Sequence, residues 1–142
     1  CKLGFDIGLK EMSAEELEYC QTAVSNWKRL NPAIMDGDQY RLVSPYKSNH
    51  MAVNYVSKDQ NKAVLFAYDI HPRYQEKLMN VKLQGLDANK MYKVEEINLM
   101  PGAKSTFKSN GKVYSGDYLM KVGLEVFGFA HTQSHVIEIT AE

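Results

Sequence analysis

Histidines are the side chains in this sequence best suited to metal binding or acid–base chemistry. His131 and His135 are four residues apart on a predicted strand or its approach, so both would lie on one face, where a metal ion could bind. No cysteine, third histidine or carboxylate follows at a matching spacing, and we therefore predict no metal site. His50 and His71 stand alone, and we interpret both as surface-loop residues.

Two carboxylates flank a glycine in Asp36-Gly37-Asp38, and this pattern indicates a tight turn more readily than acid–base chemistry. A calcium loop of the EF-hand type would need further ligands and a distal glutamate, and these are absent from the sequence. There is also no phosphate-binding Walker loop, no dinucleotide fingerprint and no nucleophile elbow. We therefore predict neither a catalytic residue nor a cofactor within this sequence.

Tyrosines recur through the second part of the chain, whereas the single tryptophan, Trp27, lies in the first part. Aromatic side chains exposed on a surface present a flat apolar face, and such faces stack on pyranose rings. Tyrosine is also favoured in strands for packing reasons alone. Both interpretations, ordinary sheet composition and a sugar-binding platform, therefore stay open for Tyr40, Tyr46, Tyr55, Tyr68, Tyr74, Tyr92, Tyr114 and Tyr118.

Composition limits the plausible partners. The chain has 142 residues with 17 basic and 17 acidic side chains, hence a formal net charge of zero. Because no basic block is present, we predict no nucleic-acid partner. No apolar run reaches the ~20 residues of a membrane span, so we expect no membrane partner. Cys20 falls on a predicted buried helix face and Cys1 at the chain end, and we expect no disulfide between them. The cellular compartment is left open.

These side chains must be positioned by secondary structure, and the clearest element is a helix that begins near Ala14. Ser13 is placed to cap it and Glu16 to complete a capping box, with Met12 and Leu17 as a hydrophobic staple. We predict that the helix ends by about residue 30, because the proline of Asn31-Pro32 lacks an N–H group and disfavours helical geometry in the residue before it.

One face of the predicted helix is apolar. Leu17, Cys20, Val24 and Trp27 recur at spacings of three and four residues, which places them on one stripe. The residues before the helix, 3–8, form a short apolar run with two glycines, and we interpret them as one strand. A single strand–helix unit cannot bury its own faces, so we expect its partner in preceding sequence.

After Pro32 the periodic segments are typical of strands. Residues 51–56 and 63–70, separated by a polar turn, predict one hairpin; residues 78–83 and 91–97 predict a second. Residues 119–127 and 136–139 complete the set, with a short edge strand at 40–43. The predicted fold is mainly β: an antiparallel β-sandwich at residues 32–142, preceded at residues 1–31 by one strand and one helix.

Several segments of the chain resemble, in order and spacing, the C-terminal part of α-galactosidases of glycoside hydrolase family 36. The resemblance rests on LGFDI at 3–7, MSAEE at 12–16, GDQYRLVSPY at 37–46, AVLFAY at 63–68, LQGLD at 83–87 and SGDYLM at 115–120. It implies that residues 1–31 are the last strand and helix of a catalytic (β/α)8 barrel and that the β-domain packs on that barrel.

The resemblance also implies an activity for the intact protein. Such enzymes release terminal α-galactosyl groups from sugars such as melibiose and raffinose, with retention of configuration. Both catalytic aspartates lie on earlier barrel strands, so neither corresponds to a residue here, Asp6 included. Gly4, Phe5 and Asp6 would lie at the end of the last barrel strand, where barrel pockets are built. Two interpretations stay open for them: part of the pocket floor, or a structural role in barrel closure.

Two functions follow for the β-domain. The favoured one is a non-catalytic stabilising domain that covers barrel surface, with a contact between copies left open. The alternative is a carbohydrate-binding module that holds galactosides on exposed tyrosines.

Overall fold

The computed structural model describes residues 4, 8–71, 73, 79–127 and 134–142. The long helix α1 (Ala14–Met35) follows a short 3-10 turn (Leu9–Glu11) and leads into strands β1 (Asp38–Val43), β2 (His50–Val56) and β3 (Lys62–Asp69). The remaining elements are β4 (Met91–Ile97), β5 (Lys112–Ser115), the short helix α2 (Gly116–Lys121) and β6 (Ser134–Ala141).

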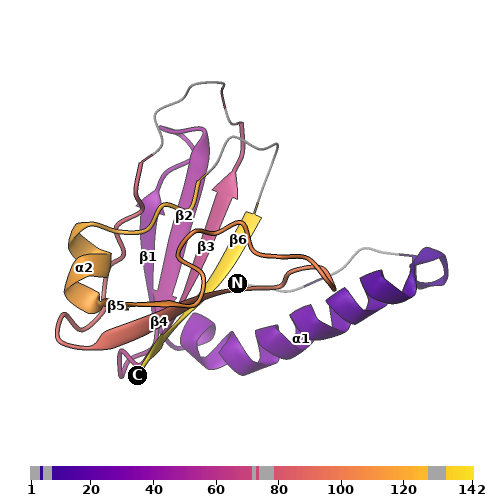
Figure 1. Ribbon diagram of the computed structural model, residues 1–142, viewed down its shortest axis with the longest axis horizontal. Coiled ribbons are helices and arrows are strands. Elements are labelled where there is room, and N and C mark those ends of the chain that lie inside the picture. The colour runs from indigo at the N-terminus through magenta and orange to yellow at the C-terminus, as the bar shows by residue number, and fades with distance from the viewer. Residues whose placement is uncertain (1–3, 5–7, 72, 74–78, 128–133) are drawn as a thin grey trace.

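All six strands belong to one antiparallel sheet with the order β1-β2-β3-β6-β4-β5. The last strand of the chain therefore lies between β3 and β4. In Figure 1, β4 and β5 run across the direction of β1, β2 and β3, as expected of a strongly twisted sheet. The predicted antiparallel β class is confirmed.

Helix α1 begins where its cap predicts. The Glu16 N–H donates to the Ser13 hydroxyl (3.2 Å) and the Ser13 N–H donates to the Glu16 carboxylate (2.8 Å), which completes the capping box. The hydrogen bonds of this box hold the pKa of Glu16 below its usual range.

The predicted end of the helix near residue 30 is wrong, because α1 continues through Pro32 to Met35. Pro32 lacks only one helical hydrogen bond so near the end, and the last turn gains burial: Ala33 and Ile34 are 4% and 5% exposed. The Asp36 N–H also donates to the Pro32 carbonyl (3.0 Å). Packing therefore outweighs the local cost of proline, and the change from helix to strand falls at residues 36–38.

Gly37 makes that change of direction compatible with close packing, and the predicted turn at residues 36–38 is confirmed. A Cβ atom on Gly37 would lie 2.2 Å from the Ala33 carbonyl oxygen and 2.4 Å from that of Val56. Only glycine lets the helix end and β2 approach this closely.

One of the two predicted hairpins is confirmed. β2 and β3 pair in register from His50 opposite Asp69 to Val56 opposite Ala63, and β1 is an edge strand as expected. The second predicted hairpin is wrong: residues 79–83 form no strand beyond a single bridge between Val81 and Leu124, and β4 pairs with β5 and β6. Val81 and Leu83 are apolar because they fill the core (each 1% exposed) as irregular chain.

The prediction of strand at 119–127 is also wrong, whereas 136–139 lies within β6. Residues 119–121 belong to α2, whose N-terminus is capped by the Ser115 hydroxyl accepting from the Tyr118 N–H (3.2 Å). The cap redirects an otherwise strand-like sequence. The strand predicted at 3–8 falls mostly outside the described residues; Gly4 and Gly8 are not in strands.

Both faces of the sheet are buried, which explains the nearly continuous apolar run in β3. Ala63, Leu65 and Ala67 point into the larger core, which α2 and segments of irregular chain cover. Val64 points to the opposite face, where Leu30 and Ile34 of α1 cover Val53 and Tyr55 of β2. The period of two along each strand thus separates two hydrophobic clusters.

Candidate functional site

The residues predicted to form a pocket floor are only partly described. Gly4 is exposed, with open space around its Cα atom, and Phe5 and Asp6 lie outside the described residues. His131 and Tyr74 lie outside them as well. His71 is exposed, as expected of a loop residue.

His50 is a buried residue, so its interpretation as a surface-loop residue is wrong. Its Nδ1 atom lies 2.7 Å from Asp69 Oδ1, and the two side chains are 3% and 0% exposed. The imidazole stacks on the Phe127 ring with centroids 4.4 Å apart. The pairing of β2 with β3 sets His50 opposite Asp69, a contact between residues 19 apart that no local pattern predicts.

His135 is also buried (7% exposed), and its Nδ1 atom pairs with the Glu96 carboxylate. The Ser105 hydroxyl donates to the other oxygen of the same carboxylate. Because the carboxylate lies between the hydroxyl and the imidazole, His135 cannot take a proton from Ser105, as a catalytic nucleophile–base pair requires. The three residues instead tie β4, β6 and the segment after β4 together.

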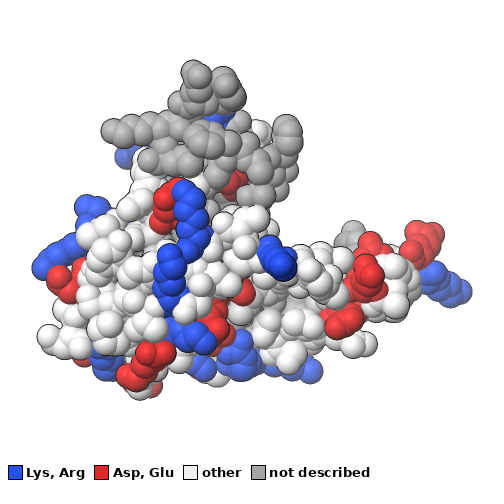
Figure 2. Space-filling model, in the orientation of Figure 1, with Lys and Arg blue, Asp and Glu red and all other residues white. Residues whose placement is uncertain are grey.

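Among the described residues, no group of three or more histidine, cysteine, aspartate or glutamate side chains is arranged to hold a metal ion. Nor does any helix in this part of the chain have the length and apolarity to cross a membrane. Acidic and basic side chains lie beside one another over the face shown in Figure 2, and several form exposed ion pairs, such as Lys108 with Glu125 and Lys121 with Asp117.

The tyrosines separate into buried and exposed groups. Tyr55 and Tyr92 are core residues. Tyr46 in the β1–β2 loop is 98% exposed and borders a hollow of about 480 Å³ with Gln39 and Arg41. Tyr118 of α2 is 41% exposed, but its ring stacks on Tyr114 with centroids 5.0 Å apart.

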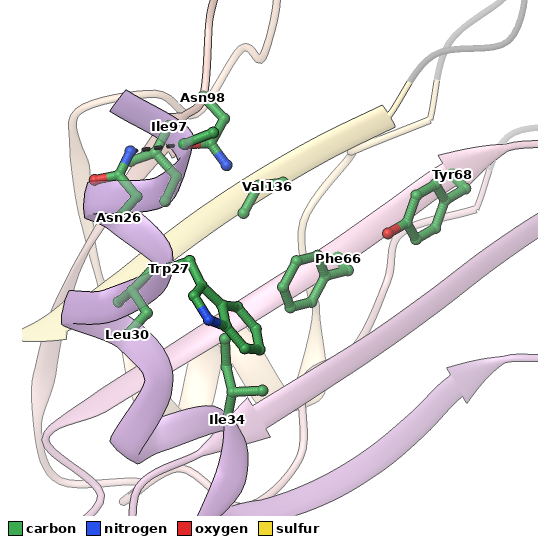
Figure 3. A pocket seen from close by; sticks show the side chains of 10 residues that line it. Asn26, Trp27, Leu30, Ile34, Phe66, Tyr68, Ile97, Asn98 and Val136 are labelled. Carbon is green, nitrogen blue, oxygen red and sulfur yellow. Dashed lines mark hydrogen bonds between the residues drawn. The ribbon is translucent and has the colours of Figure 1, made fainter. Parts of the chain in front are cut away.

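A recess lies between α1 and the sheet, and we refer to it as the α1 groove (Figure 3). It has a volume of about 190 Å³ and is largely apolar. Burial and the neighbouring Tyr55 raise the pKa of Tyr68 at its rim. The residues that define the groove are Trp27, Leu30, Phe66, Tyr68, Ile97 and Val136.

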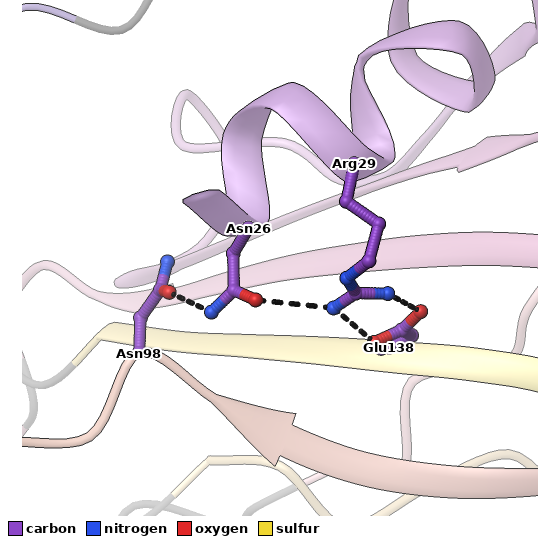
Figure 4. A network of polar contacts seen from close by, with 4 residues as sticks. All are labelled: Asn26, Arg29, Asn98 and Glu138. Atoms are coloured by element: carbon purple, nitrogen blue, oxygen red, sulfur yellow. Dashed lines mark hydrogen bonds and ion pairs between the residues drawn. The ribbon is translucent and has the colours of Figure 1, made fainter. Parts of the chain in front are cut away.

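A chain of polar contacts, which we refer to as the polar clamp, fixes α1 beside this groove (Figure 4). Arg29 donates to both carboxylate oxygens of Glu138 on β6, the Nη2–Oε2 distance being 2.7 Å, and to Asn26 Oδ1 (3.1 Å). Asn26 in turn donates to Asn98 Oδ1 (2.7 Å). The bond to Glu138 raises the pKa of Arg29. Sequence reasoning missed the clamp, because its partners are 72 and 109 residues apart.

The structure is an antiparallel β-domain, in which buried histidines pair with carboxylates and a long helix is clamped to one face of the sheet. The comparisons identify its family. Residues 50–139 match the C-terminal domain of glycosyl hydrolase family 36. The chain belongs to this family.

Named relatives agree with this assignment. The chain is 34% identical to probable α-galactosidase G of Aspergillus terreus over 122 residues, which are 86% of this chain and 15% of the relative. It is 30% identical to α-galactosidase 1 of Pediococcus pentosaceus over 121 residues, 85% of this chain and 15% of the relative. The chain thus spans only about 15% of the length of the curated relatives that it matches.

Solved structures share the fold. The α-galactosidase AgaB of Geobacillus stearothermophilus superposes with a TM-score of 0.77 at 24% identity, over 94% of this chain and 17% of that one. A variant of AgaA from the same organism, solved in complex with stachyose, has a TM-score of 0.78 at 24% identity, over 96% of this chain and 17% of that one.

Proposed function

We propose that this chain is the non-catalytic, stabilising C-terminal part of a retaining α-galactosidase that releases terminal α-galactosyl groups from melibiose- and raffinose-type sugars. The observation that carries the proposal is the family match over residues 50–139. The use of buried histidine–carboxylate pairs as ties between strands supports a structural role. Retaining hydrolysis needs two carboxyl groups ~5–5.5 Å apart on either side of the substrate, and we expect both in the part of the enzyme that precedes this chain.

Two measurements test this function. The isolated chain should not hydrolyse nitrophenyl α-galactoside, and any turnover above blank would contradict the proposal. The intact enzyme truncated after Met35 should lose activity faster on heating than the full-length enzyme does, because barrel surface is uncovered. An unchanged half-life at the same temperature would exclude the stabilising role.

The same proposal places a domain boundary within the chain. Residues 1–31 would be the last strand and helix of the catalytic barrel, and residues 32–142 the C-terminal domain. Since α1 continues to Met35 and buries Leu30 and Ile34 on the sheet, we propose that this helix is shared by the two domains. The boundary is then a rigid junction instead of a linker.

Gly4, Phe5 and Asp6 remain our proposed floor of the substrate pocket. The test is Asp6→Asn in the intact enzyme. A role in the pocket predicts reduced turnover with little change in thermal stability. Unchanged turnover with lower stability would instead assign Asp6 to barrel closure.

A second candidate function is carbohydrate binding, and the almost complete exposure of Tyr46 beside Gln39 and Arg41 favours it. An aromatic face next to amide and guanidinium donors suits a pyranose ring and its hydroxyl groups. Titration with raffinose or galactomannan, followed by calorimetry, should then show binding that Tyr46→Ala removes. No binding at millimolar sugar would exclude this candidate.

A further inference from the structure

Asn110 is followed by Gly111 in the turn immediately before β5, and both residues are exposed. It is the one asparagine in the sequence that precedes a glycine. An asparagine side chain can lose its amide group when the backbone nitrogen of the next residue attacks the side-chain carbonyl carbon. Glycine in the second position makes this attack easiest, because it has no Cβ atom to shield the nitrogen or to restrict the backbone. Of the asparagines in the chain, Asn110 therefore has the highest intrinsic reactivity.

The folded turn holds both reacting groups in hydrogen bonds. The Gly111 N–H donates to the Val94 carbonyl (2.8 Å), so the attacking nitrogen is tied to β4. The Asn110 Oδ1 atom accepts from the Glu96 N–H (2.7 Å), which fixes the side-chain carbonyl at the end of the same strand. The reaction needs a deprotonated Gly111 nitrogen and a rotated Asn110 side chain. Both conditions require these hydrogen bonds to break.

Neighbouring contacts keep the turn closed. The Asn110 N–H donates to the carbonyl of Phe107 (3.0 Å), whose side chain is buried in the larger hydrophobic cluster. The Tyr114 hydroxyl donates to the Ser109 hydroxyl (2.9 Å). Gly111 has a φ of 74°, a left-handed conformation that glycine adopts without strain. The turn is thus attached to the core on one side and to β5 on the other.

We propose that Asn110-Gly111 is a deamidation site, which the closed turn protects and which local opening of the turn exposes. In the reaction, the Gly111 nitrogen gives its proton to hydroxide and forms a bond to Asn110 Cγ. The Cγ–Nδ2 bond then breaks, and the leaving nitrogen takes a proton from water and departs as ammonia. Water opens the resulting five-membered cyclic imide at either carbonyl, so the product is aspartate or isoaspartate.

The reaction damages the end of β4, where this strand is tied to β6. Asn110 bonds the backbone of Glu96, and the Glu96 carboxylate pairs with His135 on β6. Isoaspartate adds a methylene group to the backbone and moves Gly111 relative to Val94. The end of β4 then loses two backbone hydrogen bonds, which lowers the stability of the fold. A transient opening of the turn is thereby converted into permanent damage.

Peptide mapping by mass spectrometry measures the reaction in the intact protein and needs no enzymatic activity. Folded protein and protein unfolded in urea are incubated side by side at mildly alkaline pH. The peptide that contains Asn110 is resolved into its asparagine, aspartate and isoaspartate forms. We expect deamidation to be at least about tenfold slower in the folded protein, because it proceeds only through the open turn. A smaller difference overturns the protection by the turn, and an absence of product in urea overturns the site itself.

Tyr114→Phe weakens the closed turn without altering either reacting residue, because it removes the hydrogen bond to Ser109. We expect deamidation of the folded protein to become roughly threefold to tenfold faster, the equivalent of one hydrogen bond, with an unchanged rate in urea. Tyr118→Phe is the matched control, since its ring belongs to the same stack and its substitution leaves the Ser109 contact in place. Equal rates for the two folded variants would contradict the role of the turn.

Melting temperatures recorded before and after the incubation measure the damage. The melting temperature of the wild-type protein should fall as isoaspartate accumulates. Asn110→Gln should not show this fall, because its side chain is one methylene too long for the five-membered ring. Each protein is compared with itself, so any effect of the substitution alone cancels. Isoaspartate-containing protein that melts at the original temperature would contradict the predicted damage to β4.

Discussion

Single side chains hold distant segments of this domain together, and Tyr92 is the clearest case. It is fully buried, and its hydroxyl donates to the Gln60 carbonyl (2.8 Å) and accepts from the Asp87 N–H (3.0 Å). Burial raises the pKa of this phenol, so it remains neutral and able to donate. The turn between β2 and β3 is thereby tied to the segment before β4.

Tyr92→Phe should therefore destabilise the domain. The substitution keeps the ring but removes two part-buried hydrogen bonds, to the Gln60 carbonyl and from the Asp87 N–H, at a cost of about 1–3 kcal/mol in the free energy of unfolding. Urea denaturation measures this loss. Tyr118→Phe, in a 41% exposed side chain, is the control and should change the midpoint little; equal losses would contradict the assigned role of Tyr92.

Asp59 in the β2–β3 turn should titrate at unusually low pH. Hydrogen bonds from the Ser57 hydroxyl and from the Asn61 backbone and side chain lower its pKa from 3.8 to about 2. Because the folded-state pKa is lower than the unfolded one, the ionised carboxylate stabilises the fold above about pH 4. That contribution is lost as the pH falls from 4 toward 2.

Carboxyl carbon chemical shifts followed by NMR measure this titration. A midpoint for Asp59 near its ordinary value would show that the turn contacts do not form in solution. Ser57→Ala should raise the midpoint, because it removes the contact with the largest effect on the pKa.

At the scale of elements, the position of α1 depends on contacts with distant strands, such as that of Arg29 with Glu138 on β6, and the helix sequence alone does not predict them. The Arg29 side chain is 44% exposed and the Glu138 side chain 12%, so solvent screens the pair in part. A double-mutant cycle with Arg29→Met and Glu138→Gln should give a coupling free energy of about 1 kcal/mol.

The exposed pair of Lys58 and Asp38, with side chains 67% and 54% exposed, is the matched control for the clamp. Its own cycle should give coupling close to zero, because both charges are well solvated. Equal coupling free energies in the two cycles would show that the Arg29–Glu138 contact contributes no more than an ordinary surface ion pair.

At the scale of the whole molecule, the sheet joins two hydrophobic clusters through its central strands. Leu65 of β3 is fully buried in the larger cluster. Leu65→Ala should reduce the free energy of unfolding by about 2–5 kcal/mol, because it removes packed atoms and leaves a cavity. Thermal and urea unfolding measure the loss, with Val113→Ala at the exposed edge as a control that should cost much less.

The features that sequence analysis predicted correctly are local. The Ser13–Glu16 capping box, the turn at residues 36–38 and the β2–β3 hairpin each depend on residues a few positions apart, where hydrogen bonding and chain geometry act directly. The family resemblance correctly anticipated the family match at residues 50–139. The domain boundary, the proposed pocket floor and the carbohydrate-binding alternative stay predictions.

The errors arose where distant packing competed with local preference. Pro32 predicts a helix end, but the burial of Ala33 and Ile34 carries the helix past it. Val81 and Leu83 have the pattern of a strand, yet they fill the core as irregular chain because β6 occupies the place beside β4. The burial of His50 likewise depends on the pairing of β2 with β3 and on the ring of Phe127.

The sequence by itself determined the antiparallel β character of this protein, the start of its long helix and its resemblance to α-galactosidases of family 36. Only the tertiary structure decided the strand order, the true end of α1 and the polar clamp. The physical reason is the distance along the sequence over which each kind of interaction acts. Caps, turns and periodicity act between near neighbours, whereas burial, strand pairing and ion pairs join residues far apart in the sequence, such as Arg29 and Glu138, which are separated by 109 positions.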